Sequence, residues 1–411
     1  MPNSLNRDGM SERRFTVIGI TDSHAPEFTA RALAAISRGR VFSGGVRHHA
    51  IVEGLLPEGA VWIDVAVPLA DVFEAYRQVA EEEIVVFASG DPLFYGYAAT
   101  LRREFPQAAM EVIPAFNSLQ TLAHRLCLPY EDMACTSLTG RPWGNLDVPL
   151  IERKRLIGVL TDRRKGPAQI AERLLRYGFE EYEMAVGENL GNDLTERVTI
   201  LPPAEAAGRE WQAPNCVILM AKHTRPLRMG IPEEEFEGLE GRPQMITKTP
   251  YRLMALSMLE PGLRSHMWDV GFCTGSVSIE ARLRFPRLGV TAFEKRPECE
   301  GIMERNCRRF GVPGIDCVMG DFMEADLSEI CRPDAVFLGG YGGRLDDVLG
   351  RIAGALRPGG AVVFNSVSRE SREGFERAAA ALGLTIDLTH TLTIDNHNPI
   401  TAMRAVKPSD K

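Results

Sequence analysis

Short apolar runs rich in valine, isoleucine and phenylalanine alternate with longer amphipathic stretches through the first half of the chain. Such runs are typical of buried strands, whereas apolar residues that recur every three or four positions are typical of helices. The clearest helix covers residues 25–39 and should end at Gly39. This alternation predicts an α/β domain. The strands predicted in this half are 14–20, 60–67, 83–89, 155–161 and 215–222.

The same pattern begins again in the second half. The last stretch, residues 384–407, contains two β-like runs with no helix between them. Consecutive strands without a crossover pair antiparallel, so we expect a parallel sheet that is completed by an antiparallel pair. The predicted helices are 250–262, 276–285, 296–312 and 344–360. The other predicted strands are 266–271, 288–294, 314–321, 334–340 and 360–367.

Residues 223–243, between the two patterns, combine proline, glycine and an acidic run without an apolar period. This composition is typical of a linker or an exposed crossing segment. We therefore predict a first domain at 14–222, a linker at 223–242 and a second domain at 243–407. No repeat relates the two halves, so the domains are expected to have different folds.

Composition and charge narrow the class of protein. The length of 411 residues fits two domains, and 45% apolar with 25% charged residues is ordinary for a globular chain. The net charge of −8 argues against a general binder of nucleic acids or membrane surfaces. The first fourteen residues are polar, and no apolar run is long enough to span a bilayer. Neither a secretion signal nor a membrane segment is therefore predicted.

Eight cysteines are scattered along the chain without a CxxC pair. We interpret them as reduced thiols, mostly small core residues, and predict a cytoplasmic location. Histidines occur in "RHH" (47–49) and "DNHNP" (395–399). Neither stretch supplies a complete ligand set, so no metal site is predicted.

The stretch "DVGFCTGSVSIEA" at 269–281 is the strongest candidate for chemistry. It joins a predicted strand to a predicted helix, the context in which a glycine-bearing turn binds a nucleotide or nucleoside. Gly271 allows a tight turn, and Gly275 would let a ligand approach the backbone and the helix N-terminus. Glu294 ends the next predicted strand, where one carboxylate can accept hydrogen bonds from both hydroxyls of a ribose. The ligand is therefore expected to be a nucleoside.

The residues around this turn indicate which nucleoside. Dinucleotide sites use G-x-G-x-x-G, and Cys273 stands where the middle glycine would be. Asp269, just before the turn, would repel a phosphate but suits a cationic ligand. Gly320 and Asp321, after the third strand, offer a polar edge for an adenine. Together these features resemble the S-adenosylmethionine site of class I methyltransferases.

The first half carries a second set of turns at the ends of predicted strands. In one of them Pro92 stops the strand, which would free backbone groups of Asp91 and Leu93 to face a cleft. Another begins a helix near Ser118, and a third puts Arg141 at a cleft mouth. Together and in this order they resemble the tetrapyrrole methylases, a second S-adenosylmethionine-dependent fold. The turns are "ASGDPLFYGYAATL" (88–101), "VIPAFNSLQTLAHRLCLPYED" (112–132), "SLTGRP" (137–142) and "VGENLGNDLTERV" (186–198).

This pairing of domains resembles one family, the precorrin-6Y C5,15-methyltransferases (decarboxylating) of cobalamin biosynthesis, over about residues 14–405. In the first half the resemblance rests on S-G-D-P-x-F-Y-G, P-A-x-x-S-x-Q and E-N-L-G. In the second it rests on I-T-K-x-x-x-R, D-V-G-x-x-T-G-S-V-S-I-E and "LGGYGGRLDDVL". The chain departs from the pattern in "GITDSHAPEF" (19–28), which replaces a glycine-rich loop. It departs again in "TGR", which replaces H-G-R, and at Phe272 and Cys273, which replace smaller residues.

The resemblance implies a tetrapyrrole methylase fold followed by a Rossmann-like class I methyltransferase fold. It implies two S-adenosylmethionine sites per chain, no metal, and a precorrin or cobalt-precorrin as the substrate. Residues 14–222 would methylate C5; residues 243–407 would methylate C15 and remove the C12 acetate carboxyl as carbon dioxide. The substrate carbon would attack the sulfonium methyl, so the protein must align the two at about 3–3.5 Å. A homo-oligomer is implied, and no nucleic acid or membrane partner.

The same resemblance assigns roles to residues at the strand ends. The macrocycle carries many acetate and propionate carboxylates, which arginine forks suit, so Arg141 and Arg344 are expected to bind it. Tyr341 could stack on the macrocycle, and Gly342 and Gly343 leave room for it; Tyr341 and Arg344 are the predicted catalytic residues. The predicted cofactor-binding residues are Gly90, Asp91, Leu93, Ser118, Thr247, Asp269, Gly271, Phe272, Cys273, Thr274, Gly275, Glu294, Gly320, Asp321 and Phe322.

Two alternatives stay open at this point. The first is an NAD-dependent oxidoreductase, against which Cys273 counts. The second is a non-catalytic sensor of a tetrapyrrole or nucleoside built on methylase folds, which the altered loop at 21–28 makes conceivable.

Overall fold

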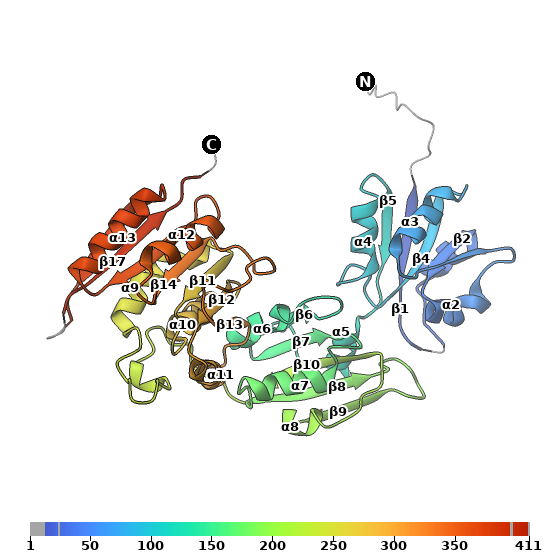
Figure 1. Ribbon diagram of the computed structural model, residues 1–411. Helices are drawn as coiled ribbons and strands as arrows, with labels where there is room; N and C mark the ends of the chain where they lie inside the picture. Colours follow the sequence, from blue (N-terminus) through green and yellow to red (C-terminus); the bar gives the residue numbers. More distant parts are fainter. Residues whose placement is uncertain (1–12, 24, 395–397, 410–411) are drawn as a thin grey trace, which may run out of the picture. The chain divides into compact units, whose positions relative to one another are not determined.

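The structure is a computed structural model that describes residues 13–409 except residue 24 and residues 395–397. It contains three β-sheets with helices packed against them (Figure 1). By its internal contacts the chain divides into two compact units. Unit 1 consists of the described residues up to Gly140 together with 156–171 and 182–220. Unit 2 consists of 141–155, 172–181 and the described residues from Ala221 onward.

The first sheet of unit 1 is parallel, in the strand order β3-β2-β4-β1-β5. Its central strands β1 and β4 have the bounds that their apolar runs predicted. Helix α1 begins later than predicted, because the Thr29 side chain accepts a hydrogen bond from Ala32 N and caps the helix there. The elements are β1 (Arg14–Ile20), α1 (Ala30–Arg38), β2 (Val41–Gly44), α2 (Val46–Val52), β3 (Val61–Asp64), α3 (Leu69–Gln78), β4 (Glu83–Ser89), α4 (Tyr97–Glu104) and β5 (Ala109–Ile113).

The second sheet of unit 1 is mixed, in the order β6-β7-β10-β8-β9. Strand β7 pairs parallel with β6 but antiparallel with β10. The elements from here to the end of β10 are α5 (Ser118–Arg125), β6 (Ala134–Ser137), α6 (Gly144–Ile151), β7 (Leu156–Leu160), α7 (Pro167–Arg176), β8 (Tyr182–Glu188), β9 (Arg197–Leu201), α8 (Pro203–Ala206) and β10 (Asn215–Ala221). Of these, α6 and the end of α7 belong to unit 2.

Unit 2 is built on a seven-stranded sheet in the order β13-β12-β11-β14-β15-β17-β16. The first five strands are parallel, and β17 runs antiparallel between β15 and β16. The predicted parallel sheet with an antiparallel pair is therefore confirmed. The elements are α9 (Thr249–Leu259), β11 (His266–Val270), α10 (Ser276–Arg284), β12 (Gly289–Glu294), α11 (Glu298–Phe310), β13 (Ile315–Met319), β14 (Ala335–Leu338), α12 (Leu345–Ala355), β15 (Ala361–Ser366), α13 (Arg369–Ala381), β16 (Thr385–Leu392) and β17 (Ile400–Val406).

Helices cover both faces of this sheet. Helices α12 and α13 contribute to an apolar cluster on one face, and α9 and α10 contribute to a cluster on the other. Strand order reverses direction between β11 and β14, which makes the carboxyl ends of these strands a topological switch point. Ligands of open α/β sheets bind in the crevice at such a point.

The segment 223–242 differs from the exposed linker that its composition predicted. Ile231, Phe236 and Leu239 are buried and join an apolar cluster with residues of α10 and α11. Charged neighbours interrupt these three apolar positions in the sequence, so their spacing shows no period. The segment is part of the second unit's core rather than a free connection.

A buried ion pair fastens the same segment. Arg252 of α9 contacts Glu280 of α10 at 3.2 Å, and both side chains are at most 2% exposed. Glu280 accepts hydrogen bonds from the backbone N–H groups of Gly230 and Ile231. Arg252 donates to the carbonyl of Thr247 at 2.8 Å. One cluster therefore fixes both the segment and the loop that leads into α9.

Candidate active sites

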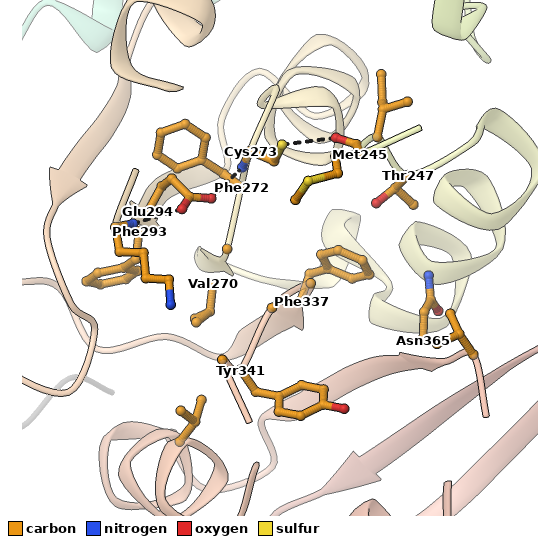
Figure 2. A pocket seen from close by; sticks show the side chains of 18 of the residues that line it. Met245, Thr247, Val270, Phe272, Cys273, Phe293, Glu294, Phe337, Tyr341 and Asn365 are labelled. Carbon is orange, nitrogen blue, oxygen red and sulfur yellow. Dashed lines mark hydrogen bonds between the residues drawn. The ribbon is translucent and has the colours of Figure 1, made fainter. Parts of the chain in front are cut away.

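A cavity of about 610 Å³ opens at the switch point of the seven-stranded sheet of unit 2 (Figure 2). Its walls come from the residues that follow β11, β12, β13 and β14, and from the loop before α9. Eleven of the predicted site residues line it. They are Thr247, Gly271, Phe272, Cys273, Glu294, Gly320, Asp321, Phe322, Tyr341, Gly342 and Arg344.

Gly271 is required by a close approach of two loops. Its φ of 82° lies in the left-handed region, and a Cβ there would stand 2.7 Å from the backbone nitrogen of Gly340. The turn after β11 thus packs directly on the loop after β14, which glycine alone allows. Gly275 also has a positive φ, but a Cβ there would meet the sulfur of Met303 at 2.2 Å. Its hydrogen faces helix α11, and neither Gly275 nor Thr274 lines the cavity.

Glu294 joins the ends of β11 and β12. Its carboxylate is buried and accepts hydrogen bonds from the backbone N–H groups of Cys273, Lys295 and Arg296 at 2.9–3.1 Å. The Arg296 guanidinium contacts both of its oxygens at 3.2 Å. Figure 2 shows the bond to Cys273 across the cavity wall. Glu294 therefore lines the cavity and holds the glycine turn, while its ribose role stays a prediction.

Asp269 lies behind the cavity rather than on its wall. It is buried, and its Oδ2 accepts a hydrogen bond from Ser278 at 2.6 Å. Its Oδ1 has no partner among the described residues. Burial, with the negative charge of Glu294 adding to it, raises the pKa of Asp269 to about 7. A direct contact between this carboxylate and a cationic ligand, as the sequence suggested, is not what the geometry offers.

Arg344 and Asp321 pair with each other at 2.5 Å across the cavity mouth. The sequence assigned them separately, the arginine to substrate carboxylates and the aspartate to an adenine. Tyr341 packs edge-on against Phe364, with ring centroids 5.8 Å apart. Gly343 has a φ of 80° and open space around it, although it does not line the cavity.

Two cavity residues were not singled out in the sequence. Tyr251 lines the cavity, and its buried hydroxyl has no partner among the described residues. Asn365, which follows the apolar part of β15, also lines the cavity, and its buried Oδ1 atom has no partner among the described residues. Buried polar atoms are nearly always hydrogen-bonded, so these two indicate a polar ligand. Tyr251 lies inside the I-T-K-x-x-x-R stretch, and this motif could have indicated it as a site residue.

An aromatic layer supports the wall of the cavity. Phe293 and Phe322 line it, and the buried Trp268 packs edge-on against both, with centroids 5.1 and 6.1 Å away. The Trp268 indole N–H donates to the carbonyl of Cys331 at 3.0 Å, which fixes the ring. Rigid aromatic walls of this kind give a flat ligand a defined surface.

Unit 1 contains its own cleft of about 1270 Å³. It is lined by the ends of β1, β4 and β5 on one side and by residues around β8 and β10 on the other. Gly19 lets these strand ends meet, because a Cβ there would stand 2.1 Å from the carbonyl oxygen of Gly90. Gly90, Asp91 and Ser118 line the cleft as predicted.

Two other residues predicted for the first site are placed differently. Leu93 does not line the cleft, and its backbone N–H donates to Oδ1 of Asp91 at 2.9 Å. The turn therefore satisfies this group internally instead of presenting it to a ligand. Arg141 follows β6, is half-buried and does not line the cleft.

Among the described residues, no three His, Cys, Asp or Glu side chains gather in a way that could hold a metal ion. Residues 395–397, part of the histidine-containing stretch near the C-terminal end, lie outside the described residues. No helix in the described part of the chain has the length and apolar character needed to cross a membrane.

Two family models match the chain. Residues 14–207 match "Tetrapyrrole (Corrin/Porphyrin) Methylases", and residues 241–411 match "Precorrin methyltransferase domain". The chain is 32% identical to the precorrin-6Y C(5,15)-methyltransferase (decarboxylating) of a Sinorhizobium species, over 96% of this chain and 94% of that protein.

Two shorter relatives come from Salmonella typhimurium. One is a cobalt-precorrin-6B C(15)-methyltransferase (decarboxylating), 37% identical over 42% of this chain and 88% of that protein. The other is a cobalt-precorrin-7 C(5)-methyltransferase, 30% identical over 50% of this chain and 98% of that protein.

Folds and sites together define an S-adenosylmethionine-dependent methyltransferase with two different methylase folds in one chain. The chain belongs to the precorrin-6Y C(5,15)-methyltransferase (decarboxylating) family. This membership confirms the predicted family and fold class, and it decides against the oxidoreductase and the non-catalytic sensor.

Proposed function

We propose that the two cavities are two separate S-adenosylmethionine sites that divide the reactions of a precorrin between them. Residues 14–222 methylate C5, and residues 243–407 methylate C15 and release the C12 acetate carboxyl as carbon dioxide. The observation that carries this proposal is that each fold has a cavity of its own at the carboxyl ends of its parallel strands.

The relatives support the same division. The C(15) relative matches over 172 residues and the C(5) relative over 204, close to the lengths of the second and first family-model matches respectively. Both activities are therefore found in Salmonella proteins of about the size of one half of this chain.

In the second cavity we propose that the turn after β11, Glu294 and the loop after β13 hold the cofactor. S-adenosylmethionine supplies an electrophilic methyl group when bound. The buried oxygens of Tyr251 and Asn365 would satisfy their hydrogen-bonding capacity with a ligand. Gly342 and Tyr341 lie where the macrocycle would enter, and Arg344 can exchange Asp321 for a substrate carboxylate. The chain's task is alignment and exclusion of water.

In the first cleft we propose that Gly90, Asp91 and Ser118 contact the second cofactor molecule. Gly90 and Asp91 directly follow β4, and Ser118 begins α5, so regular elements position all three. Gly90 has a φ of 59°, and a Cβ there would meet the backbone of Asn117 at 2.7 Å. The two strand ends thus form one continuous polar wall.

The proposed division of the two methylations is tested by variants that each block one of the two cavities with a large side chain. Thr247→Trp places an indole in the second cavity, and Ala115→Trp places one in the first; both positions are loop residues that line their cavity. With precorrin-6Y as substrate, Thr247→Trp should abolish the product that gains the C15 methyl and loses carbon dioxide. Ala115→Trp should abolish only C5 methylation. Mass spectrometry of the products measures both, with the C5 step also assayed on macrocycle that is already methylated at C15 and decarboxylated.

The wild-type chain and the two variants control for each other, because each variant keeps the activity of its intact cavity. Loss of both methylations in either variant, with the fold retained by circular dichroism, would contradict independent sites. Decarboxylation lost in Ala115→Trp but kept in Thr247→Trp would reverse the assignment.

A further inference from the structure

Three polar side chains gather on the first cleft without a role in the proposed cofactor site. Arg47 and His48 belong to α2, and Ser89 is the last residue of β4; all three line the cleft. Ser89 Oγ lies 2.9 Å from His48 Nε2 and 3.4 Å from an Arg47 guanidinium nitrogen. The helix and the strand end therefore meet at one hydroxyl group.

The hydrogen bonds assign the protons of His48. The backbone N–H of Gly45 donates to Nδ1 at 3.3 Å, so Nδ1 is the acceptor nitrogen. Burial, and next the positive charge of Arg47, lower the pKa of His48 to about 4, which keeps the ring neutral near pH 7. A neutral imidazole whose Nδ1 accepts carries its proton on Nε2. His48 also has a hydrogen bond with the backbone of Phe87, and because Nδ1 accepts from Gly45, it is Nε2–H that the Phe87 carbonyl and Ser89 Oγ share.

This assignment determines what Ser89 can offer a ligand. A hydroxyl has two acceptor lone pairs and one donor proton. His48 and Arg47 both donate to Ser89 Oγ, which engages its two lone pairs. Its proton has no acceptor among the described residues, and Ser89 is exposed and lines the cleft. The proton is thus directed at whatever fills the cleft.

Arg47 is available to the same ligand. Its guanidinium contacts Asp22 at 3.2 Å, and its side chain is 45% exposed. Asp22 is only 14% exposed and stays in place, so a ligand carboxylate would bind the part of the Arg47 guanidinium that faces the cleft. Arg125, also on the cleft, differs because it contacts both oxygens of Glu196, which accepts a further bond from the Gly191 N–H.

We propose that Arg47 and Ser89 form a carboxylate-binding subsite of the first cleft, with His48 as the positioning residue that orients the Ser89 hydroxyl. A guanidinium and a hydroxyl donor side by side suit one carboxylate, since charge-assisted bonds of this kind are the strong ones. The inference rests on the proposed function, which supplies two sources of that group. They are an acetate or propionate of the macrocycle and the methionyl carboxylate of S-adenosylmethionine.

The neighbouring His49 provides a matched control. Its ring stacks on Trp62, with centroids 4.1 Å apart and planes 16° apart, and it does not line the cleft. Adjacent histidines of one helix therefore have different surroundings. His49→Phe keeps an aromatic ring on Trp62 and should leave binding in the cleft unchanged.

The test uses the full chain with Arg47→Met, Ser89→Ala and His49→Phe. Macrocycle that already carries the C15 methyl and lacks the C12 carboxyl is titrated by visible absorption, and S-adenosylmethionine binding at the first site is measured by equilibrium dialysis. Arg47→Met should weaken one of the two ligands by about ten- to a hundred-fold, and Ser89→Ala should weaken the same ligand by roughly ten-fold. If the affinity for the macrocycle falls, the bound carboxylate is an acetate or propionate of the macrocycle. If the affinity for S-adenosylmethionine falls, it is the methionyl carboxylate. Unchanged affinity for both ligands overturns the subsite.

The positioning role has its own readout. His48→Gln keeps an amide that can donate to Ser89, whereas His48→Phe cannot donate. The glutamine variant should therefore retain most of the affinity that the phenylalanine variant loses, and equal binding by both would refute the role of His48. C15 methylation and decarboxylation by the same samples verify the fold. If the wild-type chain fails to methylate C5, the proposed function fails, yet the titration of macrocycle and cofactor still decides the subsite.

Discussion

Glu294 illustrates how much a single side chain can organise. Its carboxylate faces the cavity and also accepts the backbone N–H of Cys273 in the glycine turn. Its negative charge is matched by Arg296. A ligand bound here would meet a carboxylate whose position is already fixed, so little ordering cost remains at binding.

We predict that Glu294→Gln weakens S-adenosylmethionine binding at the second site by about ten- to a hundred-fold. The amide keeps the shape but loses the charge, and hydrogen bonds to charged groups contribute about 1.5–3 kcal/mol. Equilibrium dialysis measures the affinity, and C5 methylation should persist. Glu324→Gln, an exposed position nearby, serves as the control. An unchanged second-site affinity would reject the ribose role.

Tyr251 allows a prediction in which stability and binding move in opposite directions. Its buried hydroxyl lacks a partner among the described residues, and an unsatisfied buried group costs about 1–3 kcal/mol. Tyr251→Phe should therefore raise the thermal midpoint of the ligand-free protein while it lowers affinity at the second site. Calorimetry with and without S-adenosylmethionine or macrocycle measures both effects. A lower midpoint together with unchanged affinities would show that the hydroxyl is not a ligand contact.

For single residues, the sequence predicted where the site residues lie better than it predicted which side chains they contact. The glycine turn, Glu294 and Asp321 were all found at strand ends, because a motif between a strand and a helix fixes their place. The Asp321–Arg344 pair was not found, since it joins loops after two different strands. The burial of Asp269 was missed for the same reason: its environment depends on Ser278 and the packing of α10.

Among the secondary-structure elements, the turn after β11 depends on its contact with the loop after β14. Gly271 and Gly343 have φ values of 82° and 80°, but only Gly271 would place a Cβ against another backbone. Gly343→Ala should cost about 1–2 kcal/mol of stability through its left-handed conformation. Gly271→Ala should cost about 1–3 kcal/mol more, because the loops must separate. Urea unfolding of both variants measures the difference, and equal costs would contradict this packing.

The junction of α9 and α10 supports a second prediction at this scale. Arg252→Met leaves Glu280 buried without its partner, which typically costs about 3–5 kcal/mol. The double variant Arg252→Met with Glu280→Leu should recover much of that loss. Arg372→Met is the matched control, because its pair with Glu376 lies exposed on α13 and should cost under about 1 kcal/mol. Additive effects in the double variant would show that the pair is not coupled.

Most strands could be predicted because their apolar runs are short and end at glycine, proline or charged residues. Strand β17 was foreseen as a strand, but its place between β15 and β16 depends on pairing that the local pattern does not contain. The exposed linker predicted for residues 223–242 was wrong for a different reason. Its buried side chains, such as Phe236, gain their environment from α9, α10 and α11 rather than from their own neighbours.

For the whole molecule, the decisive quantity is the number of cofactor molecules bound. We predict two S-adenosylmethionine sites per chain, one in each cavity, because the cavities belong to different units. Equilibrium dialysis should reach two equivalents with the wild type and one with Thr247→Trp or Ala115→Trp. Saturation at one equivalent in the wild type would exclude independent sites.

The aromatic layer behind the second cavity has an optical consequence. Trp268 is one of four tryptophans in the chain, and it is separated from the cavity only by Phe293 and Phe322. Its indole is sealed from water, so its emission should lie toward the blue and respond to a conjugated macrocycle through energy transfer. In a variant that keeps Trp268 and has phenylalanine in place of the other three tryptophans, quenching of this emission would report macrocycle binding in real time, with no label attached.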